Sequence, residues 1–310
     1  MTIRELIRFS LAARCPVSIY FEMRRGIWRI MKRNIFPAKN YTQRPLISID
    51  RMRKSLNKMN LSKSDTVFVH SGIGNIGVIE GGRKAVFELL AEYVTPETGN
   101  LLFPTFPFYK GVYDYLENLK VFDVRTAPSY MGTLTQYVLE KQIGIRSISP
   151  THPVVAVGKD AEYLSKAHHK DTTPFGSNSP FQRFLQLNNP KVLLIGVSTD
   201  AATMVHNVED VLGDKFPIKT FMDKIYEINC IDWDGSSLKV KTGCHSPVVS
   251  LSRDITRFDG IYRREKAITC EVPVGLSSIA ILDAKKFFEV LTNLALQGKT
   301  IYGATHFTLS

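Results

Sequence analysis

The chain has 310 residues, of which 44% are hydrophobic and 22% charged, and its formal net charge is +11. This composition excludes wholesale disorder, and no apolar run approaches the roughly 20 residues that span a bilayer. The four cysteines lack CxxC spacing and the N-terminus lacks a signal-peptide layout, so we expect reduced thiols in a cytoplasmic protein.

The positive charge is concentrated in residues 1–44, which hold ten Lys or Arg and two Asp or Glu. The rest of the chain is nearly balanced, with 30 basic and 27 acidic residues. Residues 1–36 carry apolar side chains near the helical period, which predicts a basic helical extension over residues 1–44. Such an arm would pack on its own domain, hold a homodimer together, or make a peripheral contact with the inner face of a membrane. No nucleic-acid-binding motif accompanies it, so nucleic acid is not expected as a partner.

Residues 45–310 alternate between buried strands and helices, which is typical of an α/β domain. We expect strands at 66–72, 99–106, 152–158 and 191–197. We expect helices after Ser48, within 79–94, at 131–141, after Ser179, at 202–213 and at 283–298. Beyond residue 220 the shorter alternating runs and a DG turn predict an antiparallel hairpin. The fold class is therefore α/β: a single large domain with a central mixed sheet flanked by helices, a smaller antiparallel C-terminal subregion and an N-terminal helical extension.

The segment "HNVE", residues 206–209, is the strongest candidate for chemistry. His206 and Glu209 are spaced i, i+3 on one helix face, just after a buried strand, so that face can open on the cleft above the strand ends. A histidine with a nearby carboxylate suits a general base. The HExxH zinc spacing is absent, so no metal is expected. On spacing alone, an ordinary core or surface histidine stays an alternative.

Other candidate segments are weaker. "HSGIGNIG", residues 70–77, follows a strand but matches neither the Rossmann nor the Walker pattern, so it is equally well an ordinary strand–helix turn. "APSYMG", residues 127–132, offers either an oxyanion site or a simple helix cap. His168 and His169 are predicted to lie on a solvated surface. Cys244 and His245 are adjacent on a strand and should point to opposite faces, which disfavours a cysteine nucleophile.

Several motifs fall in an order that resembles the aminoglycoside 3-N-acetyltransferase family, over roughly residues 47–300. They are "VFVHSGIGNIG", "LLFPTF", "FDVRTAPSYMG", "RSISPTHPVVAVG", "TPFGSNSPFQRFLQL", "KVLLIGVSTDAATMVHNVED" and "GLSSIAILDAKKF". The resemblance implies an α/β architecture distinct from the common GNAT fold. It also implies transfer of an acetyl group from acetyl-CoA to the amine of an amino sugar, without a metal.

The resemblance also implies roles for individual residues. His206 would be the general base, Glu209 would orient the amine or His206, and His245 is a third candidate catalytic residue. The segments around the strand-end loop, the "PSYMG" segment and the "RSISPTHP" loop would bind the cofactor. The candidate cofactor-binding residues are His70, Ser71, Gly72, Thr105, Ser129, Tyr130, Met131, Gly132, Arg146, Ser147 and His152.

The chain departs from the family pattern at three places. "HSG" replaces the usual "HSS", so Gly72 lacks a hydroxyl, and "RSISP" replaces "RSxHP", so Ser149 stands where the family has a histidine. His245, in "KTGCHSP", lies where relatives often carry acidic residues.

The charge of the domain bears on the acceptor. A slightly basic domain predicts an anionic acceptor, such as a nucleotide- or lipid-linked amino sugar in surface-polysaccharide synthesis. The alternatives are an aminoglycoside 3-N-acetyltransferase that confers drug resistance, and a catalytically weak CoA-binding scaffold.

Overall fold

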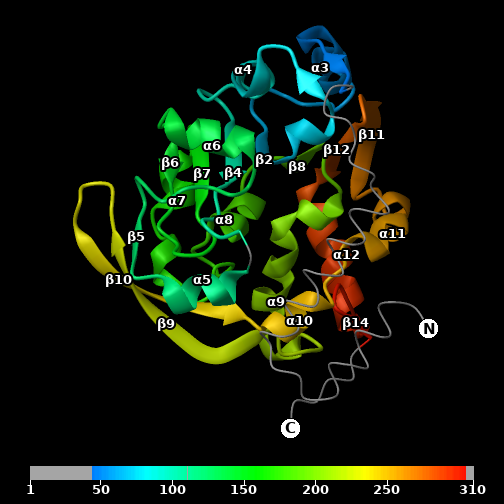
Figure 1. The fold of residues 1–310 in the computed structure, drawn as a ribbon. Helices are drawn as coiled ribbons and strands as arrows, with labels where there is room; N and C mark the ends of the chain where they lie inside the picture. Colours follow the sequence, from blue (N-terminus) through cyan, green and yellow to red (C-terminus); the bar gives the residue numbers. More distant parts are fainter. Residues whose placement is uncertain (1–43, 110, 305–310) are drawn as a thin grey trace. The chain divides into compact units, whose positions relative to one another are not determined.

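The computed structural model of the protein describes residues 44–109 and 111–304 (Figure 1). The predicted extension at residues 1–44, with its homodimer and membrane contacts, lies outside the described residues except for Arg44. Within the described ranges, no helix combines the length and the apolar character needed to cross a membrane.

The domain is built around a seven-stranded sheet with the strand order β11-β12-β8-β2-β4-β7-β6. Strands β2, β4 and β8 run parallel, whereas β7 and β12 run antiparallel to their neighbours, so the predicted mixed sheet is confirmed. Because β4 and β8 pair on opposite sides of β2, their carboxyl ends meet at a point where ligands commonly bind. The strands are β2 (Thr66–Ser71), β4 (Asn100–Pro104), β6 (Ile145–Arg146), β7 (Val154–Gly158), β8 (Pro190–Ile195), β11 (Ile268–Val274) and β12 (Ser277–Asp283).

Helices cover both faces of this sheet. Alternate residues of each strand face opposite sides, and on β2 Phe68 joins one buried cluster while Val67 and Val69 join the other. One face is covered by α3 (Ile49–Leu56), α4 (Gly82–Tyr93) and α6 (Thr133–Glu140). The other is covered by α7 (Ala161–Ser165), α8 (Pro180–Gln186), α9 (Asn207–Leu212), α11 (Asp259–Arg264) and α12 (Ala284–Leu296).

Helix caps lie where the sequence predicts them. The Ser48 side chain accepts a hydrogen bond from the Arg51 N–H, and Ser179 accepts one from Gln182 with Pro180 in the first turn of α8. Asp283 caps α12 in the same way. These contacts satisfy N–H groups that have no partner within the helix, and they fix where each helix begins.

A second, smaller sheet contains the predicted hairpin, β9 (Phe221–Ile231) and β10 (Ser237–His245). Figure 1 shows this hairpin, in yellow, reaching out beside the central sheet. Two features differ from the prediction of a separate C-terminal subregion: β5 (Val121–Asp123) joins β9 from the first half of the chain, and β11 and β12 return to the central sheet. The hairpin packs its apolar side on α5 (Val112–Asn118).

The remaining described elements are short. They are β1 (Leu46–Ile47), β3 (Val78–Ile79), β13 (Lys299–Thr300), β14 (Gly303–Ala304), α10 (Pro247–Leu251) and the 3-10 turns η2 to η7, among them η4 (Thr199–Ala201) and η5 (Thr203–His206).

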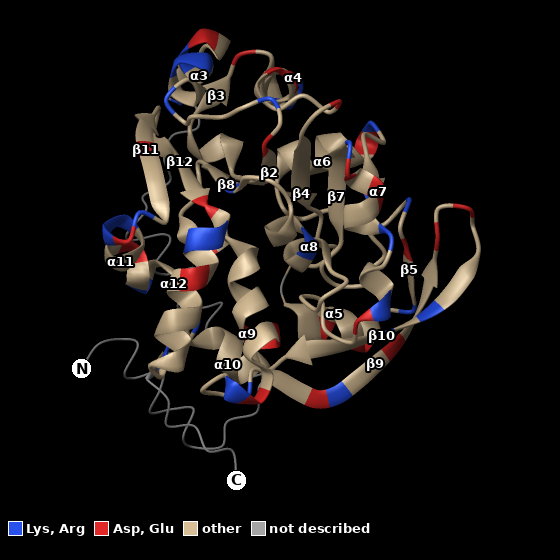
Figure 2. Cartoon of the chain, turned by 180° about the vertical axis from the view of Figure 1, so that it is seen from behind, with Lys and Arg blue, Asp and Glu red and all other residues tan. Residues whose placement is uncertain are grey.

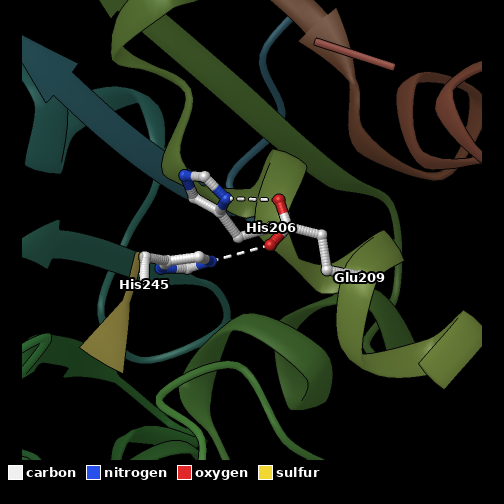
Figure 3. Close-up of side chains that lie close together, drawn as sticks. All are labelled: His206, Glu209 and His245. Atoms are coloured by element: carbon white, nitrogen blue, oxygen red, sulfur yellow. Dashed lines mark hydrogen bonds and ion pairs between the residues drawn. The ribbon is translucent and has the colours of Figure 1, made fainter. Parts of the chain in front are cut away.

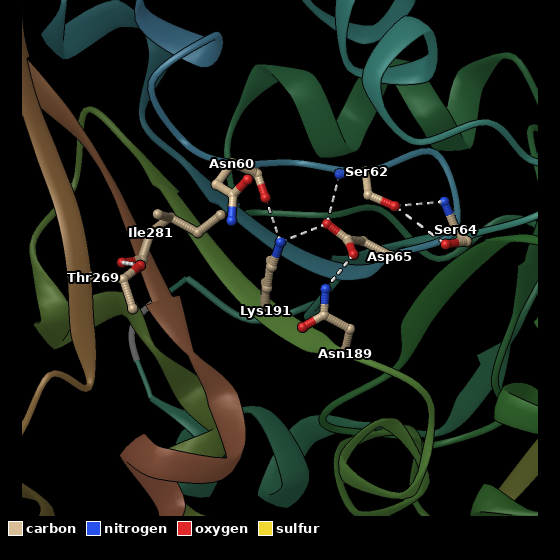
Figure 4. Close-up of polar contacts among 8 residues, drawn as sticks. All are labelled: Asn60, Ser62, Ser64, Asp65, Asn189, Lys191, Thr269 and Ile281. Atoms are coloured by element: carbon tan, nitrogen blue, oxygen red, sulfur yellow. Dashed lines mark hydrogen bonds and ion pairs between the residues drawn. The ribbon is translucent and has the colours of Figure 1, made fainter.

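A polar network around the buried Asp65 closes the amino ends of β2 and β8 (Figure 4). Asp65 accepts hydrogen bonds from the Ser62 N–H at 2.8 Å, from Lys191 Nζ at 2.7 Å and from the Asn189 side chain. Lys191 also donates to the carbonyl of Asn60. We call these five residues the amino-end network, and its contacts tie two neighbouring strands to the loops that precede them.

Candidate active site

His206 and Glu209 lie beyond the carboxyl end of β8. The chain leaves the sheet at Gly196 and passes through η4 and η5, and α9 begins at Asn207. His206 is the last residue of η5, and its Nδ1 lies 2.7 Å from Glu209 Oε1 (Figure 3). The predicted pairing is therefore present, although the helix begins one residue after His206.

His245, at the end of β10, holds the other oxygen of the same carboxylate. Its Nε2 lies 2.7 Å from Glu209 Oε2, and the two imidazole centroids are 4.6 Å apart. A register shift between Gly243 and His245 marks the end of the hairpin, where Phe221 stacks on the His245 ring at 4.1 Å. Figure 3 shows both imidazoles directed at Glu209, so one carboxylate serves two histidines.

Tyr302 completes this group, although no sequence motif pointed to it. It lies in the turn between β13 and β14, and its hydroxyl is 2.6 Å from Glu209 Oε1 and 3.2 Å from His206 Nδ1. A single tyrosine outside any motif carries no sequence pattern that points to a site. We call His206, Glu209, His245 and Tyr302 the carboxylate cluster.

The protonation states in the cluster follow from burial and charge. Burial would raise the pKa of Glu209, but the two imidazoles and their hydrogen bonds outweigh it, and the pKa lies well below its usual range. Burial lowers the pKa of His206 to about 4, despite the nearby carboxylate. Burial, and then Glu209, raise the pKa of Tyr302 well above its usual value. At neutral pH the cluster therefore holds an ionised carboxylate, a neutral His206 and a tyrosine that donates.

The nitrogen–oxygen distances in the carboxylate cluster are those of hydrogen bonds and are shorter than those between two ligands of one metal ion. The histidine nitrogens and one carboxylate oxygen all lie within 4.8 Å of one another, close enough to suggest a metal site. Ligands of a tetrahedral metal with bonds of about 2.1 Å stand roughly 3.4 Å apart. The nitrogen–oxygen distances here are 2.7 Å, the length of a charge-assisted hydrogen bond.

An acidic cleft of about 660 Å³ opens beside Glu209. Asp210 and Asp214 also line it, with Lys219 as the basic residue, and Figure 2 shows acidic residues on α9. Burial raises the pKa of Asp210 to about 6, opposed by a hydrogen bond from Thr173 and supported by the charge of Glu209. The remaining lining residues are Thr173, Gly176, Gly213, Phe216, Ile218, Thr220, Phe221 and Met222.

The carboxyl end of β2 holds two buried polar atoms without a partner in the described ranges, His70 Nε2 and Ser71 Oγ. Burial lowers the pKa of His70 to about 3, so its imidazole is neutral. Gly132, with φ of 107°, packs closely against this strand end. A Cβ at position 132 would lie 2.8 Å from the Ser71 carbonyl oxygen, so the close contact requires glycine. Unpaired buried polar atoms are costly, and their position at a strand end is suited to the polar groups of a ligand.

A family model described as aminoglycoside 3-N-acetyltransferase matches residues 68–295. The chain belongs to this family. An aminoglycoside N(3)-acetyltransferase III from Salmonella is 29% identical over 170 residues, which cover 51% of this chain and 58% of that relative. The aminoglycoside N(3')-acetyltransferase-like protein YokD of Bacillus subtilis is 27% identical over 172 residues, which cover 50% of this chain and 62% of YokD. The matched stretches thus span less than two thirds of these relatives.

Solved structures of the family share the fold. A binary complex of AAC-IIIb with CoASH has a TM-score of 0.67 at 18% identity and covers 83% of this chain and 98% of that one. A sisomicin-bound structure of AAC-VIa has a TM-score of 0.67 at 21% identity, covering 82% and 99%.

The departure from the family pattern at Gly72 has a packing reason. A Cβ at this position would lie 2.6 Å from Asn75 Nδ2 and 3.0 Å from a methyl group of Val197. Asn75 Nδ2 donates to the carbonyl of Gly196 at 2.9 Å, which joins the loops after β2 and β8. A serine at position 72 would displace this contact.

Ser149, the second departure, positions a histidine. Its Oγ accepts a hydrogen bond from the His152 N–H, and the His152 ring lies 5.0 Å from that of Phe175. The other side of Phe175 faces His206, with ring centroids 5.1 Å apart. Burial, and then His245 and His206, lower the pKa of His152 well below its usual value. His152 therefore packs on Phe175, and Phe175 in turn packs on His206 of the carboxylate cluster.

Arg146 does not have the free donors that a direct contact to CoA phosphates requires. Its guanidinium donates to Thr105 Oγ1 and to four backbone carbonyls, which uses all five N–H groups. The carbonyls belong to Thr105, Val124, Ala127 and Pro128. We therefore correct the expected role: Arg146 and Thr105 hold the loop that precedes the "PSYMG" segment.

Ser147 and His168 form a second internal pair. Ser147 Oγ lies 2.9 Å from His168 Nδ1, and His168 Nε2 lies 2.9 Å from the Pro174 carbonyl. His168 is buried, so the prediction that it is solvated is wrong, because both of its ring nitrogens have partners inside the protein. Ser147 likewise supports the loop and is not open to a ligand.

The helix cap predicted at Pro128 and Ser129 is wrong, because α6 has Gly132 at its N-cap position and no side chain caps it. Ser129 Oγ accepts from the Met131 N–H and lies 3.1 Å from Thr135 Oγ1. Tyr130 is exposed, with its ring 6.0 Å from that of Tyr109. In the "TGCHSP" segment, burial raises the pKa of the Cys244 thiol to about 12, which is unsuitable for a nucleophile.

Proposed function

We propose that this chain is an acetyl-CoA-dependent N-acetyltransferase that acylates an amine of a cationic amino sugar. The observation that carries the proposal is a buried, neutral His206 held by an ionised Glu209, with the unpaired atoms of His70 and Ser71 at a neighbouring strand end and an acidic cleft beside it. Membership of the family and the CoASH complex of a relative with the same fold support the donor.

In the proposed reaction, acetyl-CoA supplies a thioester. His206 accepts a proton through Nε2 from the attacking amine, while Glu209 holds Nδ1–H and stabilises the imidazolium that forms. His70 and Ser71 offer polar atoms to the donor at the end of β2. Direct attack needs no activated serine or cysteine, and holding both reactants side by side lowers the entropic barrier.

The acidic cleft supports one of the candidate acceptors over the others. Glu209, Asp210 and Asp214 line it, so it favours an acceptor that carries several positive charges. The net positive charge of the chain comes mostly from residues 1–44 and does not describe this cleft. The names of the relatives also support an aminoglycoside acceptor over a nucleotide- or lipid-linked sugar of polysaccharide synthesis.

Thiol release from acetyl-CoA tests the proposal, with an aminoglycoside such as sisomicin in one set of assays and nucleotide-linked amino sugars in another. We expect release with the aminoglycoside and no change on adding a chelator. Release with nucleotide-linked sugars alone would overturn the proposed acceptor. CoA binding without release across a broad amine panel would overturn the enzymatic function and leave a binding scaffold.

A further inference from the structure

In the carboxylate cluster, each of the two imidazoles contacts one oxygen of Glu209 through one ring nitrogen. Glu209 is ionised, so the nitrogens that face it, His206 Nδ1 and His245 Nε2, carry their protons and donate. This fixes the tautomer of each ring. The unprotonated nitrogens are His206 Nε2 and His245 Nδ1, and each can accept one proton.

The proposed reaction releases two protons from its acceptor. Amines with pKa values between about 7.7 and 10.4 are mostly ammonium ions at neutral pH. The acidic cleft also favours the charged form. One proton must leave before the nitrogen has a lone pair, and a second must leave as the amide forms. A site with one base can accept only one of them.

We propose that His245 is a second catalytic base, which deprotonates the bound ammonium so that His206 is free for the second proton. This inference rests on the proposed function. His245 Nδ1 takes the first proton, which makes the amine lone pair available. The nitrogen–carbon bond then forms, and His206 Nε2 takes the second proton. As the carbon–sulfur bond breaks, His206 returns that proton to the thiolate. His245 releases its proton to water, which balances the net loss of one proton.

The surroundings of His245 support a charge change at this position. Glu209 is 2.7 Å away, and Asp210, on the same helix, also interacts with His245. Two carboxylates therefore lie close to the ring that would accept the proton. His206 and His152 are neutral because burial lowers their pKa values, so neither adds a charge beside His245.

Two further groups face the cluster from other elements. Arg253 interacts with His206, His152 and Tyr302 and is the positive charge that opposes a second cation. Tyr302 donates to Glu209, which leaves one lone pair fewer for the imidazoles.

His245 also lies next to the cleft that would hold the acceptor. Phe221, which stacks on its ring, and Thr220 both line that cleft, as does Glu209. The His245 side chain retains 8% exposure, equal to that of His206. The two histidines are thus equally buried, and each contacts a different oxygen of the one carboxylate that reaches the cleft.

The test uses His245→Gln, because a glutamine amide can keep a hydrogen bond to Glu209 but cannot accept a proton. We measure kcat/KM for an aminoglycoside acceptor from pH about 6.5 to about 9.5. We expect a loss of about 100-fold at the low end. The loss should shrink to a few-fold at the high end, where free amine is abundant. The matched control is His169→Gln, at a histidine outside the cluster, whose profile should follow the wild type.

A pH-independent loss in His245→Gln would show a merely structural role and overturn the inference, as would an unchanged profile. A direct readout is the imidazole nitrogen NMR signal of His245, assigned by its disappearance in the variant. Adding the acceptor with CoA in place of acetyl-CoA should move this signal towards the imidazolium value; a signal that stays neutral would contradict the proposal. If the wild type itself transfers no acetyl group at any pH, it is the proposed function that fails.

Discussion

The two ends of the β2–β8 strand pair each carry a buried carboxylate that accepts three hydrogen bonds, but the donors differ. At the amino ends, Asp65 is held by a backbone N–H, an amide and the permanent cation of Lys191. At the carboxyl ends, Glu209 is held by two imidazoles and a hydroxyl. A lysine has only donors to offer, whereas an imidazole that donates through one nitrogen can accept a proton at the other.

The two ends of these strands also differ in their buried polar atoms that lack a hydrogen-bond partner. His70 Nε2 and Ser71 Oγ, at the carboxyl end of β2, are buried without a partner in the part of the chain that the structure describes. The charged groups of the amino-end network are paired with one another (Figure 4). Paired charges thus lie at one end of the strands, and unpaired polar atoms lie at the other end beside the proposed catalytic cluster.

The largest expected effect on turnover comes from replacing His206. Replacing it with alanine should lower the turnover of acetyl-CoA-dependent transfer by about 10²–10⁴-fold, because the general base is lost. Thiol release measures this effect, and His169→Ala is the control. If His206→Ala kept wild-type turnover, the cluster would not be the reactive end.

Asp65 should show the opposite signature. Asp65→Asn leaves Lys191, whose side chain is only 14% exposed, without its counter-ion, and should lower the free energy of unfolding by about 3–5 kcal/mol. Turnover of the folded fraction should be unchanged. Urea unfolding measures the loss, and the double variant Asp65→Asn/Lys191→Met should recover part of it. A loss of turnover in the folded fraction would erase the distinction between the two ends.

Tyr302→Phe should have an intermediate effect on transfer. It removes one of three hydrogen bonds to an ionised carboxylate, worth about 1.5–3 kcal/mol, so we expect kcat to fall by at least about 10-fold. Tyr262→Phe is the matched control, since the Tyr262 hydroxyl is buried without a partner among the described residues. Equal effects of both changes on kcat would assign Tyr302 to packing.

Asp210→Asn should have the smallest effect, confined to acceptor binding. A charge worth about 1 kcal/mol changes KM for a cationic acceptor by about five-fold. The pKa of Asp210 is raised to about 6, so its charge is present above that pH and is lost below it. Wild-type KM should therefore rise as the pH falls through 6, and KM of the variant should not. Asp50→Asn, at an exposed position on α3 outside the cleft lining, serves as control.

The sequence predicts the repeating parts of this molecule well. Local sequence patterns predict the buried strands β2, β4 and β8 and the helix caps at Ser48 and Ser179. Contacts between distant segments do not change these elements. Short elements such as β5 and β6 have too few residues for a period. Their place depends on partners far along the chain.

The residues of the candidate site likewise differ in how well the sequence predicts their contacts. His206 and Glu209 are predictable because they are three residues apart, whereas the contact of His245 with Glu209 joins residues 36 apart and that of Tyr302 joins residues 93 apart. Arg146 shows the converse error, since an arginine in a motif gives no sign of how many of its donors are already used.

The position of Tyr302 has a consequence for synthesis of the chain. Strands β2, β4 and β8 leave the ribosome long before residue 302, and domains fold from the N-terminus as they emerge. A nascent chain can therefore form its central sheet, and even pair His206 with Glu209, while the third hydrogen bond to that carboxylate has yet to be translated. Activity should therefore appear late in translation, after the central strands have formed.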